Sequence, residues 1–297
     1  ILDVLAYNTY ISSYNANMVA NEVFIDSATL RENVVSLARN IGYLPRSRTA
    51  ARATVSFYVD TSNIIPVPSS ITLRAGPVAA TSSAFGNSSL VFSISEDITV
   101  PVKDNRANFN NINIYEGTLL TSEFTKSASD PNQRFVLPNS GIDTSLIKVS
   151  VKSNSFATTE TKYSSQNDLF DITGESKVFF LQEVKDEKYE IRFGDGLLGK
   201  KLGSAVGKDG TIITVDYITS DGVDGNGASA FSFSGSLINP NTNTSIDISS
   251  TPTVTTITSS QGGSEIEPID SIKYYSPKIY SSQNRAVTSR DYQVRTL

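Results

Sequence analysis

Apolar residues recur with helical spacing near the start of the chain. Val4, Ile11 and Met18 lie seven residues apart, and Tyr7 and Tyr14 repeat this interval three residues later. Such a row is the a/d pattern of a helix that packs against another helix. It predicts a first helix whose packed face contains these five residues.

A second helix is predicted to begin at Asp26 or Ser27, because either side chain can accept hydrogen bonds from a helix N-terminus. Gly42 and Pro45 are predicted to end it. The two helices form either a hairpin packed on its own domain or a bundle with other chains. The second interpretation makes the apolar faces an interaction surface, which consists of Val4, Tyr7, Ile11, Tyr14, Met18, Leu30, Val34, Leu37 and Ile41.

Beyond residue 46 the pattern changes to alternation, as at Val55, Phe57 and Val59. Short alternating runs separated by Gly and Pro predict an antiparallel β-sandwich or barrel rather than βαβ units. One hairpin is expected to turn at Glu116–Gly117.

Helical signals return near the end of the chain. Ser264 suits a helix N-terminus, and Thr288 with Asp291 resembles a capping box. We therefore expect an α+β fold with a helical N-terminal hairpin, sandwich-like β-rich central domains and a helical C-terminal segment. The predicted domains are a helical segment 1–45, a β-rich domain 46–152, a second β-rich domain 153–233 with Gly-rich turns, a low-complexity linker 234–263 and the start of an association domain 264–297.

Composition narrows the possible chemistry. The 297 residues contain no His and no Cys, which removes the usual general base, the thiolate nucleophile and the thiolate zinc site. Carboxylates such as Asp195 and Asp216 remain, but nothing in the sequence brings two of them together. A net charge of −5 disfavours nucleic acid as a partner, and no apolar run reaches the roughly 20 residues of a membrane span. We expect no enzyme, no cofactor, no metal site and no membrane partner.

A glycine-rich stretch matches parts of two nucleotide-binding patterns. Gly194–Gly199 fits G-x-G-x-x-G, and Gly194–Lys200 fits most of a phosphate loop. Both need a following helix, which glycines interrupt here, and a second Lys follows where the phosphate loop has Ser or Thr. Asp221–Gly227 lacks the closing Glu of a calcium loop. The predicted role is structural, with turns at Gly194, Asp195, Gly196, Gly199, Gly222, Gly225 and Gly227.

Three ordered blocks of residues carry a family resemblance. The first contains Leu5–Asn8, Asn17, Asn21–Glu22, Arg31–Val35 and Gly42–Pro45; the second contains Phe193–Gly196, Gly199, Leu202, Asp216–Tyr217, Asp221–Gly222 and Gly225–Gly227; the third contains Gly262–Gly263, Glu267, Ile269, Ile272, Pro277, Gln283–Thr288 and Asp291–Tyr292. Together they resemble the baseplate J-like family of contractile phage tails, and within it the wedge subunits of T-even-type phages.

This resemblance implies a structural virion protein that is assembled in the host cytoplasm. In the family, six wedges close a ring around a hub, the N-terminal helices join a bundle with a partner wedge protein, and a later domain binds a second copy. Wedge rearrangement is linked there to sheath contraction. The family's C-terminal part is absent, so we expect this chain to be part of a longer protein. The alternatives are a carbohydrate-binding tail adhesin, against which the absence of Trp argues, and a nucleotide-binding enzyme.

Overall fold

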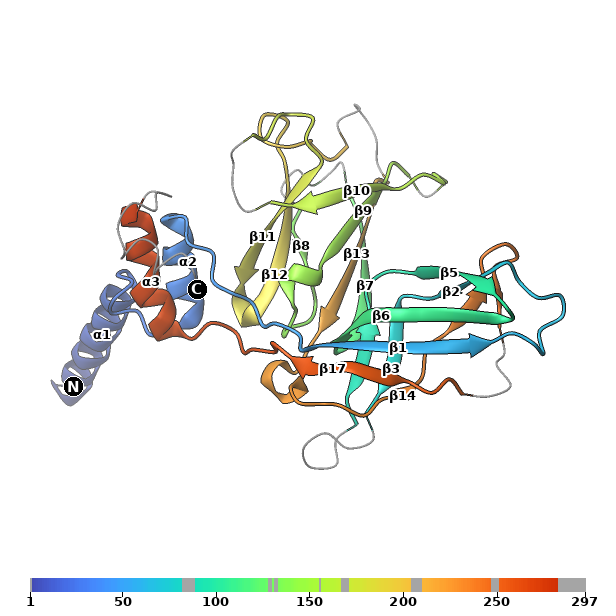
Figure 1. Ribbon diagram of the computed structural model, residues 1–297. Coiled ribbons are helices and arrows are strands. Elements are labelled where there is room, and N and C mark those ends of the chain that lie inside the picture. Colours follow the sequence, from blue (N-terminus) through green and yellow to red (C-terminus); the bar gives the residue numbers. More distant parts are fainter. Residues whose placement is uncertain are drawn as a thin grey trace. The chain divides into compact units, whose positions relative to one another are not determined.

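The computed structural model describes residues 2–81, 89–127, 130, 133–154, 156–166, 171–203, 210–246 and 251–282. The chain divides into two compact units. The helical unit comprises Ile1–Arg46, Gln182–Tyr189 and Glu267–Leu297, and the β unit comprises Ser47–Leu181 and Glu190–Ile266. Helices near both ends of the sequence and mostly antiparallel strands between them confirm the predicted α+β fold (Figure 1).

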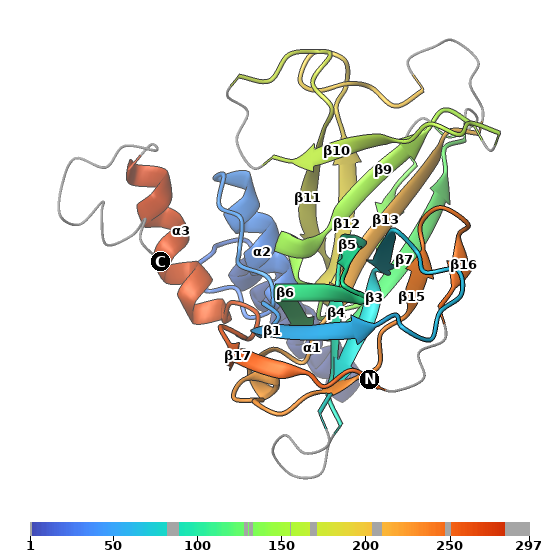
Figure 2. The same cartoon turned by 45° about the vertical axis from the view of Figure 1, so that its right-hand side comes forward.

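The helical unit contains α1 (Leu2–Glu22), α2 (Arg31–Asn40) and α3 (Ile269–Ser282). Helices α2 and α3 lie side by side in both views (Figures 1 and 2). Their apolar core consists of Ala28, Val34, Val35, Ala38, Tyr43 and Ile272, with Leu37, Ile269 and Ile279 partly buried against it. The final predicted capping box, Thr288 with Asp291, lies outside the described residues.

The second helix begins later than predicted, at Arg31 instead of Asp26 or Ser27. The carboxylate of Glu22, at the end of α1, accepts hydrogen bonds from the backbone amides of Thr29 and Leu30 at 2.8 and 3.3 Å. A side chain from the preceding helix therefore supplies the acceptor that the prediction assigned to a local cap. The hydrogen bonds from Thr29 and Asn33 hold the pKa of Glu22 down at about 2.

The larger sheet of the β unit has ten strands in the order β14-β3-β4-β6-β5-β2-β15-β16, with β1 paired to β6 and β17 paired to β1. These strands are β1 (Arg52–Asp60), β2 (Ser70–Leu73), β3 (Gly76–Ala80), β4 (Val91–Ile94), β5 (Ile98–Lys103), β6 (Arg106–Glu116), β14 (Ser232–Phe233), β15 (Leu237–Asn239), β16 (Thr244–Ser245) and β17 (Thr255–Gln261). The predicted alternation of β1 points Val55, Phe57 and Val59 into the core, where Phe57 stacks on Phe109 with ring centroids 4.8 Å apart.

The second sheet has seven strands in the order β7-β13-β9-β10-β11-β12-β8. They are β7 (Thr118–Thr125), β8 (Phe135–Val136), β9 (Lys148–Lys152), β10 (Thr161–Ser165), β11 (Val178–Val184), β12 (Lys188–Phe193) and β13 (Ile212–Thr219). Figure 2 shows β9, β12, β13 and β7 across this sheet. Three short 3-10 helices, η1 (Thr144–Leu146), η2 (Lys185–Glu187) and η3 (Gly222–Gly225), lie in the connections.

The predicted hairpin at Glu116–Gly117 is wrong. β6 pairs with β1, β4 and β5, whereas β7 pairs with β13, so the chain passes between sheets at Gly117. Gly117 has φ +117°, and a Cβ there would overlap the carbonyl of Thr219. A turn residue between two strands identifies a bend, but it does not say whether the two strands pair with each other.

The segment 234–263, predicted to be a linker with one strand-like run at Val254–Ile257, contributes β15, β16 and β17 to the larger sheet, and the predicted run overlaps β17. Its Ser and Thr residues supply main-chain hydrogen bonds to neighbouring strands, a role that composition does not reveal. The predicted boundary after residue 152 differs from the division between sheets as well. β7 lies in the second sheet and β14 lies in the larger one.

Candidate interaction surface

Helix α1 exposes its predicted apolar row. Val4, Tyr7, Tyr14 and Met18 keep 64, 66, 53 and 43 % of their surface exposed, and Ile11 is half-buried. No described residue of the 21-residue helix is buried. Soluble monomers rarely leave contiguous apolar surface of this kind in water, so the row is a candidate docking face.

A second set of apolar residues lies on the opposite side of α1 and directly after its last residue. Leu2, Leu5 and Val19 in the helix and Val23 after it are all more than half exposed. Their positions continue a spacing of three and four residues that runs through Thr9, Ser12 and Ala16. In the sequence, Leu2 and Leu5 widen the apolar face at the start of the predicted helix, but polar Thr9 and Ser12 interrupt the row, so its continuation to Val19 was not predicted. Apolar side chains therefore lie opposite the heptad row near each end of the helix, which is typical of a helix that is covered on more than one side.

The predicted residues of the second helix are not all available to a partner. Val34 is completely buried in the core of the helical unit, and Leu37 packs partly against that core. Ile41 is half-buried, while Leu30 is half exposed. The interaction prediction is therefore wrong for Val34, whose apolar side is satisfied internally by α3.

A buried polar network fixes α2 within the helical unit. Arg31 forms a two-pronged ion pair with Glu183, with Nε–Oε1 and Nη2–Oε2 distances of 2.7 and 3.1 Å. Glu267 accepts a hydrogen bond from the Tyr43 hydroxyl at 2.7 Å and one from the backbone amide of Arg46 at 3.0 Å. Burial raises the pKa of Glu183, and the hydrogen bond from Arg31 opposes this shift. Sequence reasoning missed this network because its hydrogen-bonded partners lie more than 150 positions apart.

The glycine turn after β12 is closed on itself. The carboxylate of Asp195 accepts hydrogen bonds from the amides of Leu197 and Leu198 at 2.8 and 2.9 Å, and the Gly196 amide donates to Gly199 O at 3.0 Å. A Cβ on Gly194 would overlap the backbone of Gly199. The amides that a phosphate would need are thus used inside the turn. The sequence also predicted that no helix follows this turn, but residues 204–209 of that segment lie outside the described residues.

The second glycine turn, Asp221–Gly227, is held in place by hydrogen bonds to Glu116. This buried carboxylate accepts hydrogen bonds from Ser220 Oγ at 2.6 Å and from the Asp221 amide at 3.1 Å. Burial raises its pKa, and the hydrogen bond from Ser220 counteracts the rise. Gly222 has φ +66° and Gly227 φ +88°, and Gly225 approaches the side chain of Glu116 too closely for a Cβ. Within the described ranges, no group of three or more acidic side chains is arranged to hold a metal ion.

Similarity to known proteins covers nearly the whole chain. No family model matches the chain. None of the helices in the described part of the chain has the length and apolarity of a membrane span. The chain is 24 % identical over 305 residues to baseplate wedge protein gp6 of Enterobacteria phage T4, which covers 98 % of this chain and 44 % of gp6. It therefore spans less than half the length of that relative. The predicted resemblance is confirmed: along almost all of its length, this chain is similar to a gp6-like baseplate wedge protein.

Proposed function

We propose that this chain is a structural subunit of a contractile-tail baseplate wedge, with α1 as its docking helix. The similarity to T4 gp6 supports the baseplate role. The observation that carries the docking role is the exposure of two apolar rows on one helix. A structural role needs no catalytic group, which agrees with a chain that lacks His and Cys.

In this role, α1 enters a helical bundle with other wedge chains. Burying one Val, Leu, Ile or Met side chain contributes roughly 1.5–3 kcal/mol. Val4 and Met18 are 64 and 43 % exposed and Ile11 is half-buried, so covering the surface that these three still expose would contribute on the order of 2–4 kcal/mol, before the cost of association. A stable association therefore needs the other exposed apolar residues of α1 as well.

The wider role follows the family. The wedges close a ring around the hub of the tail, a second copy of the chain takes part in the ring, and the wedges rearrange when the sheath contracts. The subunit is part of the virion and joins its partners in the host cytoplasm. It uses no cofactor and binds neither nucleic acid nor membrane.

Substitution of the exposed row tests the docking role. Ile11→Asp with Met18→Asp should weaken binding to the co-purified wedge proteins of the same phage by roughly 100-fold or more, since each change removes apolar contact and places an unpaired carboxylate in the interface. Titration calorimetry or pull-down with those wedge proteins measures the change. The control is Ser13→Asp with Asn17→Asp, which adds the same two charges to exposed polar positions of α1. Unchanged binding by the Ile11/Met18 variant, with the β unit still folded, would show that the row is not an interface.

A further inference from the structure

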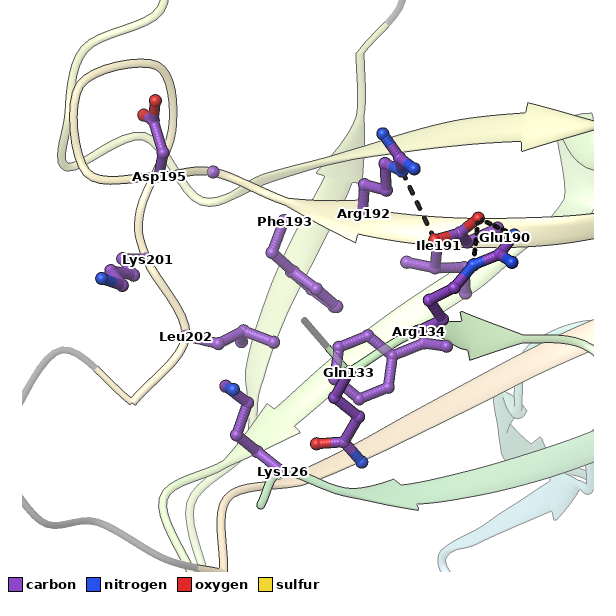
Figure 3. A pocket seen from close by; sticks show the side chains of 12 residues that line it. Lys126, Gln133, Arg134, Glu190, Ile191, Arg192, Phe193, Asp195, Lys201 and Leu202 are labelled. Atoms are coloured by element: carbon purple, nitrogen blue, oxygen red, sulfur yellow. Dashed lines mark hydrogen bonds and ion pairs between the residues drawn. The ribbon is translucent and has the colours of Figure 1, made fainter. Parts of the chain in front are cut away.

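The β unit contains an open cavity of about 570 Å³ beside β8 and β12. Four cationic side chains, Lys126, Arg134, Arg192 and Lys201, and two acidic ones, Glu190 and Asp195, line it together with apolar residues. We call it the cationic pocket. Figure 3 shows Arg134 and Arg192 directed towards Glu190, and Lys126 and Lys201 along the other side of the opening.

The pocket carries more positive charge than its own acids neutralise. Glu190 faces two guanidinium groups, with Arg134 Nη2 at 2.6 Å and Arg192 Nε at 3.4 Å. Burial raises the pKa of Glu190, but these two cations outweigh it and hold the pKa below its ordinary value, so the carboxylate is charged. Among the described residues, no carboxylate lies within ion-pair distance of Lys126 or Lys201. This surplus is local, since the whole chain carries a net charge of −5.

The interior of the pocket is aromatic. Phe135 contacts Phe124 and Phe193 with ring centroids 5.7 and 5.9 Å apart, and Phe193 contacts Tyr163 at 5.5 Å. Phe135, Phe193 and Leu202 belong to the lining. A complementary ligand would therefore present carboxylates beside a small apolar side chain.

Such a group is present on the same unit, in the turn Asp221-Gly222-Val223-Asp224. Val223 is 50 % exposed, and both flanking aspartates are exposed. We call these four residues the acidic turn. Glu116 holds its base, and the side chain of Asn226 exchanges two hydrogen bonds of 2.8 Å with the backbone of Gly263. A turn held in this way loses little conformational entropy when it docks.

The acidic turn and the cationic pocket lie at opposite ends of the β unit. Figure 1 shows the short orange helix that contains the turn beside β17, and the yellow loop that follows β12 at the far end. One copy therefore cannot bring its own turn into its own pocket. We infer that the acidic turn of one copy docks into the cationic pocket of a second copy.

This contact joins two different surfaces, so repetition gives a closed ring if the rotation closes and a filament if it does not. It extends the proposed assembly role and uses no residue of α1. Its attraction is ionic at the rim, which makes it sensitive to salt, whereas burial of the α1 rows depends little on ionic strength.

Sedimentation velocity of the 297-residue chain tests the inference. The wild type should self-associate at an ionic strength of about 0.01 M and dissociate at about 1 M, where the Debye length falls from about 30 to 3 Å. Lys126→Glu with Lys201→Glu should weaken this association about tenfold or more, and so should Asp221→Lys with Asp224→Lys. Mixing the two variants should restore it, because each supplies the partner charge of the other.

The control variant Lys103→Glu with Lys185→Glu makes the same charge change at exposed lysines outside the pocket. It should associate as strongly as the wild type. The inference is overturned if the chain stays monomeric at low ionic strength, if the pocket variant associates as strongly as the control, or if the mixture does not recover. Ile11→Asp with Met18→Asp should leave the salt-sensitive association intact, so a failure of the α1 proposal and a failure of this one give different results.

Discussion

Arg31→Met is expected to destabilise the helical unit by about 3–5 kcal/mol at pH 7, because removing one partner of a buried ion pair leaves the other charge buried and uncompensated. The side chains of Arg31 and Glu183 are 17 and 3 % exposed, and two hydrogen bonds join them. Methionine keeps much of the aliphatic contact of arginine but leaves the Glu183 carboxylate buried without its counter-charge. Arg31→Met with Glu183→Met should recover most of the loss, because two apolar side chains leave no uncompensated charge.

The destabilisation should depend on pH in a defined direction. Burial raises the pKa of Glu183 above its unfolded value, so protonation favours the folded state. The stability that this carboxyl contributes is present below the unfolded pKa of about 4.3 and is lost as the pH rises through the folded pKa. Without Arg31 the folded pKa rises further. The deficit of Arg31→Met relative to the wild type should therefore shrink between pH 7 and pH 5.

Amide hydrogen exchange of α2, read by mass spectrometry, gives the opening free energy of this unit without requiring the whole chain to unfold in one step. Arg74→Met is the control, since Arg74 is an exposed arginine of the β unit. An exchange difference below about 0.5 kcal/mol between Arg31→Met and the wild type, the usual effect of a surface change, would refute the reasoning. So would a double variant no more stable than the single one.

Two further outcomes are expected. Gly194→Ala should lower the thermal unfolding midpoint more than Gly196→Ala, because a Cβ at residue 194 would overlap the Gly199 backbone. A Cβ at residue 196 would meet only Lys201 Cβ, at 3.8 Å, so that substitution costs only about 1–2 kcal/mol, the strain of a side chain at its φ of +98°. Equal midpoints by calorimetry would contradict this. The amides of Thr29 and Leu30 should lose their hydrogen bonds to Glu22 only as the pH falls towards about 2. The pKa of this carboxyl is lower in the folded state than in the unfolded state, so its contribution to stability is present above the unfolded pKa and is lost as the pH falls through the folded pKa. An NMR titration of those amides measures it, with Glu22→Gln as control, and a midpoint at the unfolded pKa would count against it.

Local periodicity predicted the fold where one element determines its own pattern. The heptad row of α1 and the alternation of Val55, Phe57 and Val59 both require only that neighbouring side chains share a face. Pairing between distant strands follows no such rule. The Ser- and Thr-rich strand β17 joins β1 through main-chain groups that every residue has, so its sequence does not identify the strand with which it pairs.

The same distinction applies to the functional residues. The exposed row of α1 could be predicted from spacing, and the glycine turns could be predicted from residue type, because glycine adopts a φ such as the +98° of Gly196 without strain. Val34 has the same pattern as an interface residue, but α3, more than 200 positions later, covers it. The ion pairs of Glu183 with Arg31 and of Glu190 with Arg134 depend on tertiary approach, and a single sequence carries no signal for them.

The two proposed contacts differ in the physics that holds them, and the difference would suit the proposed wedge assembly if it both persists and rearranges. Burial of the α1 rows removes apolar surface from water and would fix the chain to its wedge partners under all ionic conditions. The acidic turn has only a small apolar tip in Val223, and its attraction to the cationic pocket acts between partly exposed charges. Such contacts form quickly, specify orientation and separate at low cost. A wedge that keeps its helical bundle and exchanges its ionic contact would change its neighbours without losing its partners.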